Sequence, residues 1–351
     1  MFYFCSNIQG KVVMDFSIKI KDYSQVVVGD VTELLPRLLP DKRVVVISDT
    51  NIDRYYHPLL ESFDHILIGL GESSKTLMTA DTIYRRFIEL GVDRSTFILG
   101  IGGGIVTDIT GFVASTFMRG VEFGFVSTSL LGQVDASVGG KNGVNVDGYK
   151  NMVGVFRQPR FVICDVNMLR TLPKREFRTG LAEIIKSAII ADKQLFEMLE
   201  SADFSTLQQN TELLQQMVFR AISVKASIVE RDECEAGDRR LLNLGHTLAH
   251  AIEKSSSKMN HGEAVAVGLS MICNTASSQG IFAENDRVQS LLTNSGFTLE
   301  PPVGVSQLMK AISKDKKAEG DDIHIVLPLN IGKCTVEKMP IVEFKALFSA
   351  K

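Results

Sequence analysis

The chain has no tryptophan, only five cysteines and no excess of basic charge, and these shortages exclude several classes of protein. A net charge of −3 gives no global positive field to hold nucleic acid or an anionic membrane, so we predict neither as a partner. No apolar run approaches the ~20 residues of a membrane-spanning helix. The beginning, MFYFCSNIQGK, lacks a basic segment followed by a long apolar core, and we predict no signal peptide.

The cysteines are odd in number, scattered and never spaced as CxxC. This pattern is typical of reduced thiols rather than of a disulfide framework, and it predicts a cytoplasmic protein in which each cysteine is a small buried hydrophobe. The 351 residues are 45% hydrophobic and 23% charged, which suits a globular protein of about two domains.

The first half alternates short β-branched runs with amphipathic segments. Continuous apolar strands separated by helices are typical of a parallel sheet that is covered on both faces. The predicted strands are 25–29, 43–49, 65–70, 96–102 and 124–128, and the predicted helices between them include 31–39 and 76–91.

The second half has a helical pattern from about Glu176 onward. The exception is IHIVLPL (323–329), which is strand-like and could pair locally. We therefore expect an α/β domain at 1–172 and an α-helical domain at 173–351, with the boundary in the glycine- and proline-containing stretch 139–173.

FILGIGGGIVTDITG (97–111) predicts a strand, a glycine block and a helix. Glycine lets the backbone approach a phosphate closely, and a helix N-terminus offers free N–H groups. Asp108 lies near the helix start, and Asp49, at the end of an earlier strand, could bind nucleotide hydroxyls. The block follows about the fourth strand and is not the GxGxxG fingerprint, so a tight turn without a ligand is the alternative. The Gly/Asn/Lys-rich stretch 139–151 is a second candidate, with a solvated loop as its alternative.

Charged side chains also fall where apolar ones are expected. Lys225 shares a predicted helix face with Val218 and Ile222, so its ammonium needs a partner or a ligand unless it reaches the rim of the face. Glu183 and Lys186 are i, i+3 neighbours on an apolar helix. They form either an ordinary helix ion pair or a carboxylate ligand beside an anion-binding ammonium.

Three of the six histidines fall within residues 241–269. His246 and His250 are four apart on one face of a predicted helix, and His261 opens the next helix. A helical HxxxH followed by a third ligand is a possible zinc arrangement, although TLA, between the first two histidines, contains no glutamate and excludes the HExxH protease pattern. Structural histidines are the alternative.

Taken together, these motifs resemble the 3-dehydroquinate synthase family of sugar phosphate cyclases. The matching segments run in the family order from about residue 43 to residue 334, and they are GGGIVTDITGFVASTFMRG, STSLLGQVDASVGGKNGVN, KNMVGVFRQP, TLPKREFRTGLAEIIK, NLGHTLAHAIE, HGEAVAVG and DKK.

The resemblance implies an N-terminal Rossmann-like parallel-sheet domain, a C-terminal α-helical domain and an active site in the cleft between them. It implies a homodimer that uses NAD and one divalent metal, zinc or cobalt. The implied reaction converts 3-deoxy-D-arabino-heptulosonate 7-phosphate to 3-dehydroquinate and phosphate, the second step of the shikimate pathway. Its steps are transient oxidation by NAD, phosphate elimination, re-reduction and aldol closure.

The resemblance also implies roles for individual residues. The metal ligands are Glu183, His246 and His261, and His250 contacts substrate instead. The cofactor-binding residues are Asp49, Asn51, Glu72, Lys75, Gly103, Gly104, Asp108, Thr128, Ser129, Lys150, Asn151 and Thr171. The catalytic and substrate-binding residues are Asp135, Lys141, Lys186, Lys225, Glu235, Arg239, Asn243, His250, Lys316 and, acting from the partner subunit, Arg119.

Two departures from the family pattern bear on the cofactor loop. Family members often carry threonine where this chain has Asn142 and glycine where it has Tyr149, so the loop could differ in shape. Two other activities are alternatives. Another sugar phosphate cyclase would share the cofactor and metal but accept a different sugar phosphate, and a metal-dependent polyol dehydrogenase would show net NAD reduction.

Overall fold

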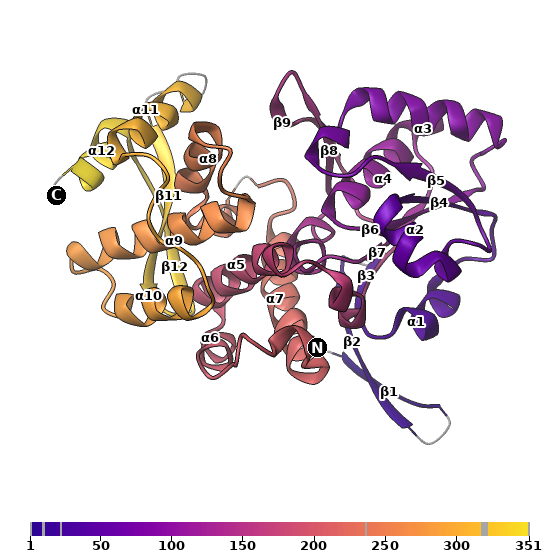
Figure 1. Ribbon diagram of the computed structural model, residues 1–351, viewed down its shortest axis with the longest axis horizontal. Coiled ribbons are helices and arrows are strands. Elements are labelled where there is room, and N and C mark those ends of the chain that lie inside the picture. Colours follow the sequence, from indigo (N-terminus) through magenta and orange to yellow (C-terminus); the bar gives the residue numbers. More distant parts are fainter. Residues whose placement is uncertain (1, 9–10, 22, 236, 317–321, 350–351) are drawn as a thin grey trace. The chain divides into compact units, whose positions relative to one another are not determined.

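The computed structural model describes residues 2–8, 11–21, 23–235, 237–316 and 322–349, and it describes their side chains except in 2–8, 11–15, 313–316 and 349. Two compact units make up the chain (Figure 1). The first comprises Met1–Pro173 and Thr211–Glu230, and the second comprises Lys174–Asn210 and Arg231–Lys351.

An eight-stranded sheet forms the centre of the first unit, in the spatial order β1-β2-β3-β10-β7-β6-β4-β5. β1, β2 and β3 are antiparallel neighbours, and β3, β10, β7, β6, β4 and β5 pair in parallel. All five predicted strands are confirmed as β3 to β7. The bounds are β1 (Phe2–Ile8), β2 (Lys11–Ile20), β3 (Ser24–Val28), β4 (Val44–Asp49), β5 (Asp64–Ile68), β6 (Phe97–Gly102), β7 (Phe123–Ser127) and β10 (Phe161–Cys164).

Helices cover both faces of this sheet. Successive strand residues point to opposite faces, and Leu99 belongs to one buried cluster with Leu34 of α1 and Ile52 of α2. On the other face, a side chain at Gly100 would collide with Thr110 of α4. The parallel, doubly covered sheet predicted from the apolar strands is therefore confirmed. The bounds are α1 (Val31–Leu38), α2 (Thr50–Tyr56), α3 (Leu77–Glu89) and α4 (Gly104–Thr116).

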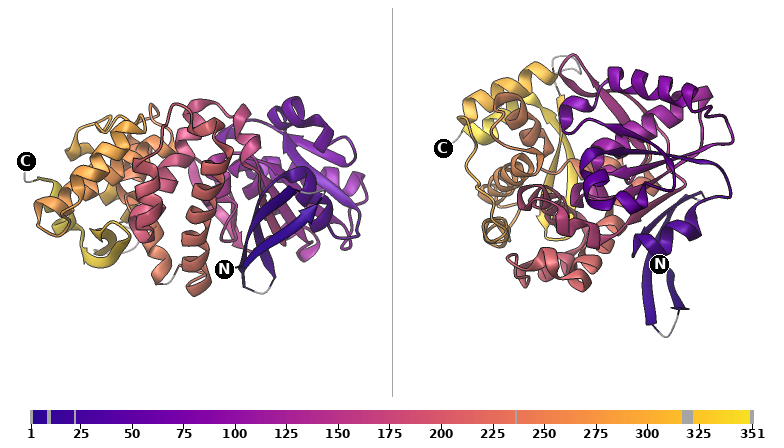
Figure 2. Two further views of the ribbon diagram at one scale, coloured as in Figure 1. Left: turned by 90° about the horizontal axis from the view of Figure 1, so that it is seen from below. Right: turned by 45° about the vertical axis from the view of Figure 1, so that its right-hand side comes forward.

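Two further elements complete the first unit. The Gly/Asn/Lys-rich stretch 139–151, for which a solvated loop was the alternative, contributes to an antiparallel hairpin. The hairpin consists of β8 (Lys141–Val146) and β9 (Tyr149–Phe156). The long helix α7 (Thr211–Arg231) belongs to this unit up to Glu230, and its Phe219 ring lies 4.7 Å from the ring of Phe16 on β2. Figure 2 shows β1 and β2 as a ribbon that extends beyond the rest of the sheet.

The second unit is mainly helical, with one two-stranded sheet. The strand predicted at 323–329 is confirmed as β11, which pairs antiparallel with β12. The helices are α5 (Lys174–Ala191), α6 (Lys193–Glu200), α8 (His246–Ser255), α9 (His261–Ser278), α10 (Asn285–Asn294), α11 (Val305–Lys316) and α12 (Ile341–Ser349), and the strands are β11 (Asp322–Asn330) and β12 (Lys333–Pro340). Shorter helical turns in the chain are η1 (His57–Leu59), η2 (Glu72–Ser74), η3 (Phe117–Arg119), η4 (Gly132–Ala136), η5 (Val166–Thr171), η6 (Leu207–Gln209) and η7 (Asp238–Asn243).

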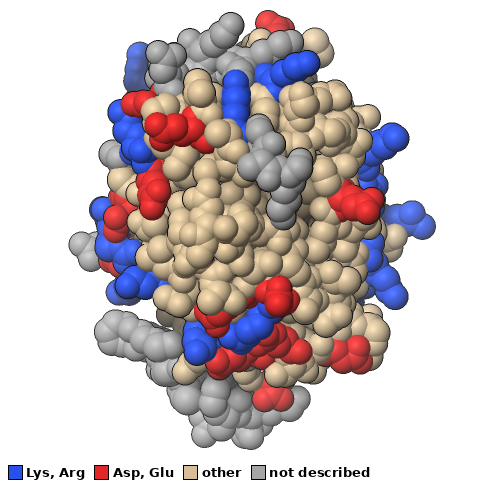
Figure 3. All heavy atoms as spheres, turned by 90° about the vertical axis from the view of Figure 1, so that its left-hand side faces the viewer, with Lys and Arg blue, Asp and Glu red and all other residues tan. Residues whose placement is uncertain are grey.

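The surface carries charges of both signs. Figure 3 views the face that lies to the left in Figure 1, where Lys and Arg are interspersed with Asp and Glu near the edges and no broad field of one sign appears among the described residues. None of the helices formed by the described residues combines the length and apolarity needed to span a lipid bilayer. Cys164 and Cys273 are buried as predicted, Cys334 is only partly buried, and Cys234 is exposed, so the prediction for Cys234 is wrong. The side chain of Cys5 lies outside the described residues.

Candidate active site

The carboxyl ends of the parallel strands form one candidate site. β4 lies between β5 and β6, so the strand order reverses beside β4. Open α/β sheets bind ligands at such a reversal, outside the carboxyl ends of the strands. Asp49 ends β4, Gly103 follows β6 and Thr128 follows β7. The remaining residues predicted to bind the cofactor in this unit are Asn51, Glu72, Lys75, Gly104, Asp108, Ser129, Lys150, Asn151 and Thr171.

The glycine block begins α4. Gly103 is the N-cap and Gly104 the first residue of the helix, so their backbone N–H groups are available to an anion. A Cβ at Gly103 would lie 3.1 Å from the Ser129 hydroxyl, and a Cβ at Gly104 would lie 3.0 Å from the Ala136 Cβ. The backbone is thus exposed where a side chain would fill the space. Asp49 caps α2 in turn, and its Oδ1 accepts from the backbone N–H groups of Asn51 and Ile52.

Lys75 lies at the centre of a polar network in the first unit. Its buried ammonium forms an ion pair with Asp108 and donates to Asn151 Oδ1 at 2.5 Å. Burial raises the pKa of Asp108 to about 6, and the charge of Lys75 opposes that rise. Asn151 adopts a left-handed φ of 53°, a conformation that non-glycine residues seldom take without support.

Asn145 joins this network, and sequence reasoning missed it. Its backbone N–H donates to the Lys75 carbonyl at 2.8 Å, and its Nδ2 donates to Glu72 Oε1 at 2.7 Å. Its Oδ1 accepts from the Asn151 N–H at 2.9 Å. One amide therefore connects the β8–β9 hairpin to the segment that follows β5. The sequence has no signal for it, because the three partners lie at different distances along the chain.

The two departures in the hairpin fit the structure without disturbing this network. Asn142 is buried, and its Nδ2 donates to the carbonyls of Gly140 and Arg157 at 2.9 and 2.8 Å. Its side chain occupies the space beside Gly111, where a Cβ would lie 1.8 Å from its Oδ1. Tyr149 is exposed on β9.

Four residues predicted to act on substrate also belong to the first unit. Lys225, on the apolar face of α7, is buried and donates to Asp135 Oδ1 at 2.6 Å and to the Asp135 carbonyl at 2.5 Å. The partner that its position required is therefore Asp135. Lys141 is exposed at the start of β8, and Arg119 has a left-handed φ of 68°.

The second unit contains a candidate metal centre. Glu183 of α5, His246 of α8 and His261 of α9 offer ligand atoms that all lie within 4.8 Å of one another. Glu183 Oε1 lies 3.5 Å from His246 Nε2 and 3.2 Å from His261 Nε2. Tetrahedral bonds of about 2.0 to 2.1 Å place neighbouring ligand atoms about 3.3 Å apart. The two measured separations fit such an ion.

The surroundings orient the two imidazoles for this role. His246 Nδ1 lies 3.2 Å from the Leu244 carbonyl, which accepts a hydrogen bond from Nδ1–H and so makes Nε2 the nitrogen available to a metal. His261 Nδ1 lies 3.7 Å from the Glu253 carboxylate. His250, the other partner suggested by spacing, is not part of this group, although its ring centroid lies 5.7 Å from that of His246.

The groups of the centre shift one another's pKa values. Burial favours the neutral acid at Glu183, but Lys186 and the imidazoles outweigh it and hold its pKa well below the usual range. Burial also lowers the pKa of His261, yet the carboxylates of Glu183 and Glu253 outweigh burial and raise it to about 10. Glu183 is therefore ionised, and its carboxylate together with that of Glu253 favours positive charge at His261.

The remaining predicted substrate residues of the second unit come from several elements: Lys186 from α5, Glu235 from the segment before η7, Arg239 and Asn243 from η7, His250 from α8 and Lys316 from the end of α11. Lys186 is buried and forms an ion pair with Glu183. Asn243 Nδ2 donates to Glu235 Oε1 at 2.7 Å, and the buried Arg239 donates to the Glu233 carbonyl at 2.5 Å. Burial lowers the pKa of His250 to about 4, so its ring is neutral at pH 7. The side chain of Lys316 lies outside the described residues.

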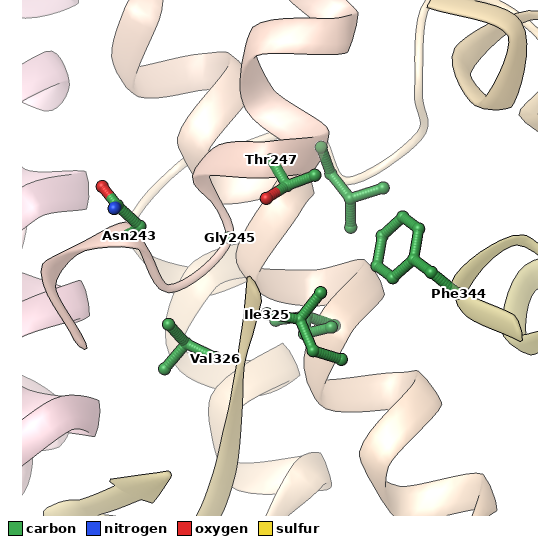
Figure 4. Close-up of a pocket in the computed structure, with 8 residues that line it drawn as sticks. Asn243, Gly245, Thr247, Ile325, Val326 and Phe344 are labelled. Atoms are coloured by element: carbon green, nitrogen blue, oxygen red, sulfur yellow. The ribbon is translucent and has the colours of Figure 1, made fainter. Parts of the chain in front are cut away.

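A small pocket is lined in part by residues of the 243–248 segment, which includes His246, as Figure 4 shows. Asn243 lines it from the end of η7 and Thr247 from the start of α8, and Ile325 and Phe344 line it from β11 and α12. Phe344 is only 1% exposed, so the last helix is packed firmly beside the segment that carries His246. The pocket wall is mostly apolar and supports this segment.

The fold and the site define the class of protein. A doubly covered parallel sheet presents glycine and polar residues at its carboxyl edge, and a helical unit presents one carboxylate and two imidazoles. Three protein ligands leave positions open for substrate, as a catalytic metal requires. These features are those of a metal-dependent enzyme with an α/β domain of the nucleotide-binding type.

Comparison with known proteins identifies the family. Residues 65–179 match the family described as 3-dehydroquinate synthase N-terminal, and residues 180–318 match 3-dehydroquinate synthase C-terminal. The 3-dehydroquinate synthase of Rippkaea orientalis is 39% identical over 330 residues, which cover 88% of this chain and 89% of the relative. That of Clostridium kluyveri is 35% identical and covers 94% of this chain and 96% of its own. The chain belongs to the 3-dehydroquinate synthase family.

Solved structures agree on the fold. The 2-epi-5-epi-valiolone synthase of Streptomyces hygroscopicus, with NAD+ and Zn2+ bound, has a TM-score of 0.84 and is 26% identical, covering 94% of this chain and 97% of its own. A 2-deoxy-scyllo-inosose synthase complexed with carbaglucose-6-phosphate, NAD+ and Co2+ has a TM-score of 0.81 at 24% identity, covering 95% and 98%.

Proposed function

We propose that this protein converts 3-deoxy-D-arabino-heptulosonate 7-phosphate to 3-dehydroquinate and phosphate, with NAD and one divalent metal, zinc or cobalt, as cofactors. One observation carries the proposal: a chain 35–40% identical to 3-dehydroquinate synthases over most of its length also brings Glu183, His246 and His261 together. The reaction is the second step of the shikimate pathway, and we place it in the cytoplasm.

Bound NAD and a bound divalent cation would together supply the reversible oxidation of a secondary alcohol of the substrate. Glu183, His246 and His261 would hold the cation. The residues at the carboxyl edge of the sheet would hold NAD, with the N–H groups of Gly103 and Gly104 available to its phosphates.

The other residues of the chain would bind and orient an anionic substrate. Phosphate leaves with a proton from the carbon next to the transient ketone, so the chain needs fixed positive charge more than a strong base. Lys225, held by Asp135, and Lys186, held by Glu183, supply ammonium groups with fixed positions. Lys141, Arg239 and Lys316 would add positive charge, Glu235, Asn243 and His250 would contact substrate hydroxyls, and in a homodimer Arg119 would reach the site of the partner subunit.

The test follows phosphate and absorbance at 340 nm in one reaction with the heptulosonate phosphate, catalytic NAD and zinc. We expect one phosphate per substrate with no accumulation of NADH, and loss of both substrate turnover and phosphate release after chelation. Phosphate release from hexose or other heptulose phosphates alone would move the chain to another cyclase activity. Accumulation of NADH with a polyol would indicate a dehydrogenase and contradict the proposal.

Asn145→Asp is expected to weaken NAD binding about tenfold while metal affinity stays unchanged. The substitution keeps the acceptor for the Asn151 N–H but replaces the donor to Glu72 with a carboxylate. The lost hydrogen bond to a charged group is worth roughly 1.5 kcal/mol. Calorimetric titration with NAD measures the effect. Asn285→Asp is the matched control, because Asn285 also uses both side-chain atoms, with Asn274 and Gln289, on α10. A dissociation constant within twofold of the wild type would count against the role of Asn145.

Asp108 should make NAD binding depend on pH. Its pKa is raised to about 6, so it is ionised at pH 7 and gains a proton as the pH falls through 6. Protonation removes the charge that holds Lys75, and NAD affinity should then fall by up to about tenfold per pH unit, the limit for one proton. Titrations between pH 5 and pH 8 measure the slope. Asp108→Asn should flatten it, and an unchanged slope in that variant would assign the titration to another group.

A further inference from the structure

We infer that Arg175 and Glu263 are positioning residues that fix helices α5 and α9 relative to each other, so that Glu183 and His261 can bind one metal ion. The inference rests on the proposed function only in assuming that this centre binds a metal. Arg175 lies about two turns before Glu183 on α5. Glu263 lies two residues after His261, the first residue of α9.

A forked ion pair joins the two helices. Arg175 Nε donates to Glu263 Oε1 at 2.8 Å, and its second terminal nitrogen donates to Glu263 Oε2 at 2.7 Å. The same nitrogen donates to the Lys258 carbonyl at 3.0 Å, in the segment before α9. Two parallel bonds between a guanidinium and a carboxylate fix orientation as well as distance.

The Glu263 carboxylate also determines where α9 begins. Its Oε2 accepts from the Asn260 N–H at 2.9 Å, and its own N–H donates to Asn260 Oδ1 at 3.0 Å, which together form a capping box. His261 is the first residue of the helix, directly after the capping residue Asn260. One side chain therefore holds both the partner helix and the backbone that carries a metal ligand.

Close backbone contact makes the metal centre sensitive to any slip of these helices. A Cβ on Gly262 would lie 2.3 Å from the Thr179 Cα and 2.7 Å from its carbonyl oxygen, so the helices touch without an intervening side chain. Thr179 lies one turn before Glu183, and Gly262 follows His261. A shift at this contact moves the two ligand atoms, now 3.2 Å apart, by a similar amount.

The Arg175–Glu263 ion pair is too exposed for its main effect to be on the free energy of unfolding. The Arg175 side chain is 53% exposed and that of Glu263 is 24% exposed. Ion pairs at the surface contribute little to the free energy of unfolding. Loss of a group that orients a metal ligand, in contrast, typically weakens metal binding by 10- to 100-fold. The positioning role therefore predicts a change in metal affinity that is out of proportion to the change in stability.

The test uses Arg175→Lys and Glu263→Gln. Lysine keeps the charge but loses the fork, and glutamine can keep the capping box but loses the charged partner. Arg287→Lys is the matched control. Arg287 makes an equivalent fork with Glu200, at 2.9 and 2.6 Å, and it joins α6 to α10, neither of which carries a metal ligand.

Zinc affinity is measured on chelator-stripped protein by competition with a chromogenic chelator, without NAD or substrate, and the cobalt absorption spectrum reports coordination geometry. We expect Arg175→Lys and Glu263→Gln to bind zinc 10- to 100-fold more weakly with an altered cobalt spectrum, and Arg287→Lys to match the wild type. Thermal melting should barely separate the three variants. Wild-type affinity in the first two, or equal weakening in the control, would overturn the inference. A wild-type protein that binds no divalent metal would instead overturn the metal centre of the proposed function.

Discussion

Replacing Glu183 with glutamine should abolish divalent metal binding and phosphate release together. Glu183 is 1% exposed, and its Oε1 faces the Nε2 atoms of both His246 and His261. It is the one negatively charged ligand in this group of three, because the other two are imidazoles. Its removal should weaken zinc binding by more than the roughly 10- to 100-fold that follows loss of an orienting group. Chelator competition and the phosphate assay on the same preparation measure both effects.

A second variant separates metal loss from unfolding. Glu183→Gln also removes the carboxylate that contacts buried Lys186, which should destabilise the fold by about 3 to 5 kcal/mol. The double variant Glu183→Gln with Lys186→Met removes both charges, so denaturant melts should recover much of that stability while zinc binding stays lost. Zinc binding at wild-type affinity in the single variant would show that the metal binds elsewhere and contradict the assignment of Glu183.

Lys225→Met should reduce turnover by about 100- to 1,000-fold and leave metal affinity unchanged. Methionine has a similar length and suits the apolar face of α7, so the main loss is the ammonium that Asp135 holds. Removing a preorganised group that stabilises developing charge costs about that factor. The metal ligands belong to other elements and are not touched.

The phosphate assay and the zinc competition assay measure the two halves of this prediction. Lys42→Met is the matched control, because Lys42 forms an ion pair with Glu122 in the same unit but is partly exposed. It should retain wild-type turnover. A Lys225→Met protein that keeps more than a tenth of the wild-type rate would remove Lys225 from the catalytic group.

Much of the fold could be predicted from the sequence because its signals are local. Strands β3 to β7 come from apolar runs between helical patterns. β3, β4, β6 and β7 are almost wholly buried, whereas burial alternates along the edge strand β5, where Leu67 is exposed. β10 has only four residues, too few to show a pattern, and β9 is exposed along nearly its whole length. The β8–β9 hairpin therefore had no alternation of apolar and polar residues by which to recognise it.

The site could be predicted from the sequence only where the position of a single residue, such as a charge on an apolar helix face, indicates its surroundings. The position of Lys225 on an apolar face showed that its charge needed a partner, but Asp135 lies 90 residues away and no local pattern could name it. Spacing among the histidines favoured His246 with His250, because it records helix faces and not contacts between helices. Glu183 enters the metal group from α5, and the resemblance to the family, not the spacing, indicated it.

The placement of α7 has a consequence for how the protein is made. The first unit is interrupted after Pro173 and is completed only by Thr211–Glu230. During synthesis the residues of the sheet are made first. Lys225, the partner of Asp135, is added 90 residues later, which takes roughly 5 to 18 s at typical elongation rates. Throughout that interval the surface that α7 later covers, including the ring of Phe16, is open to water, to chaperones and to other nascent chains.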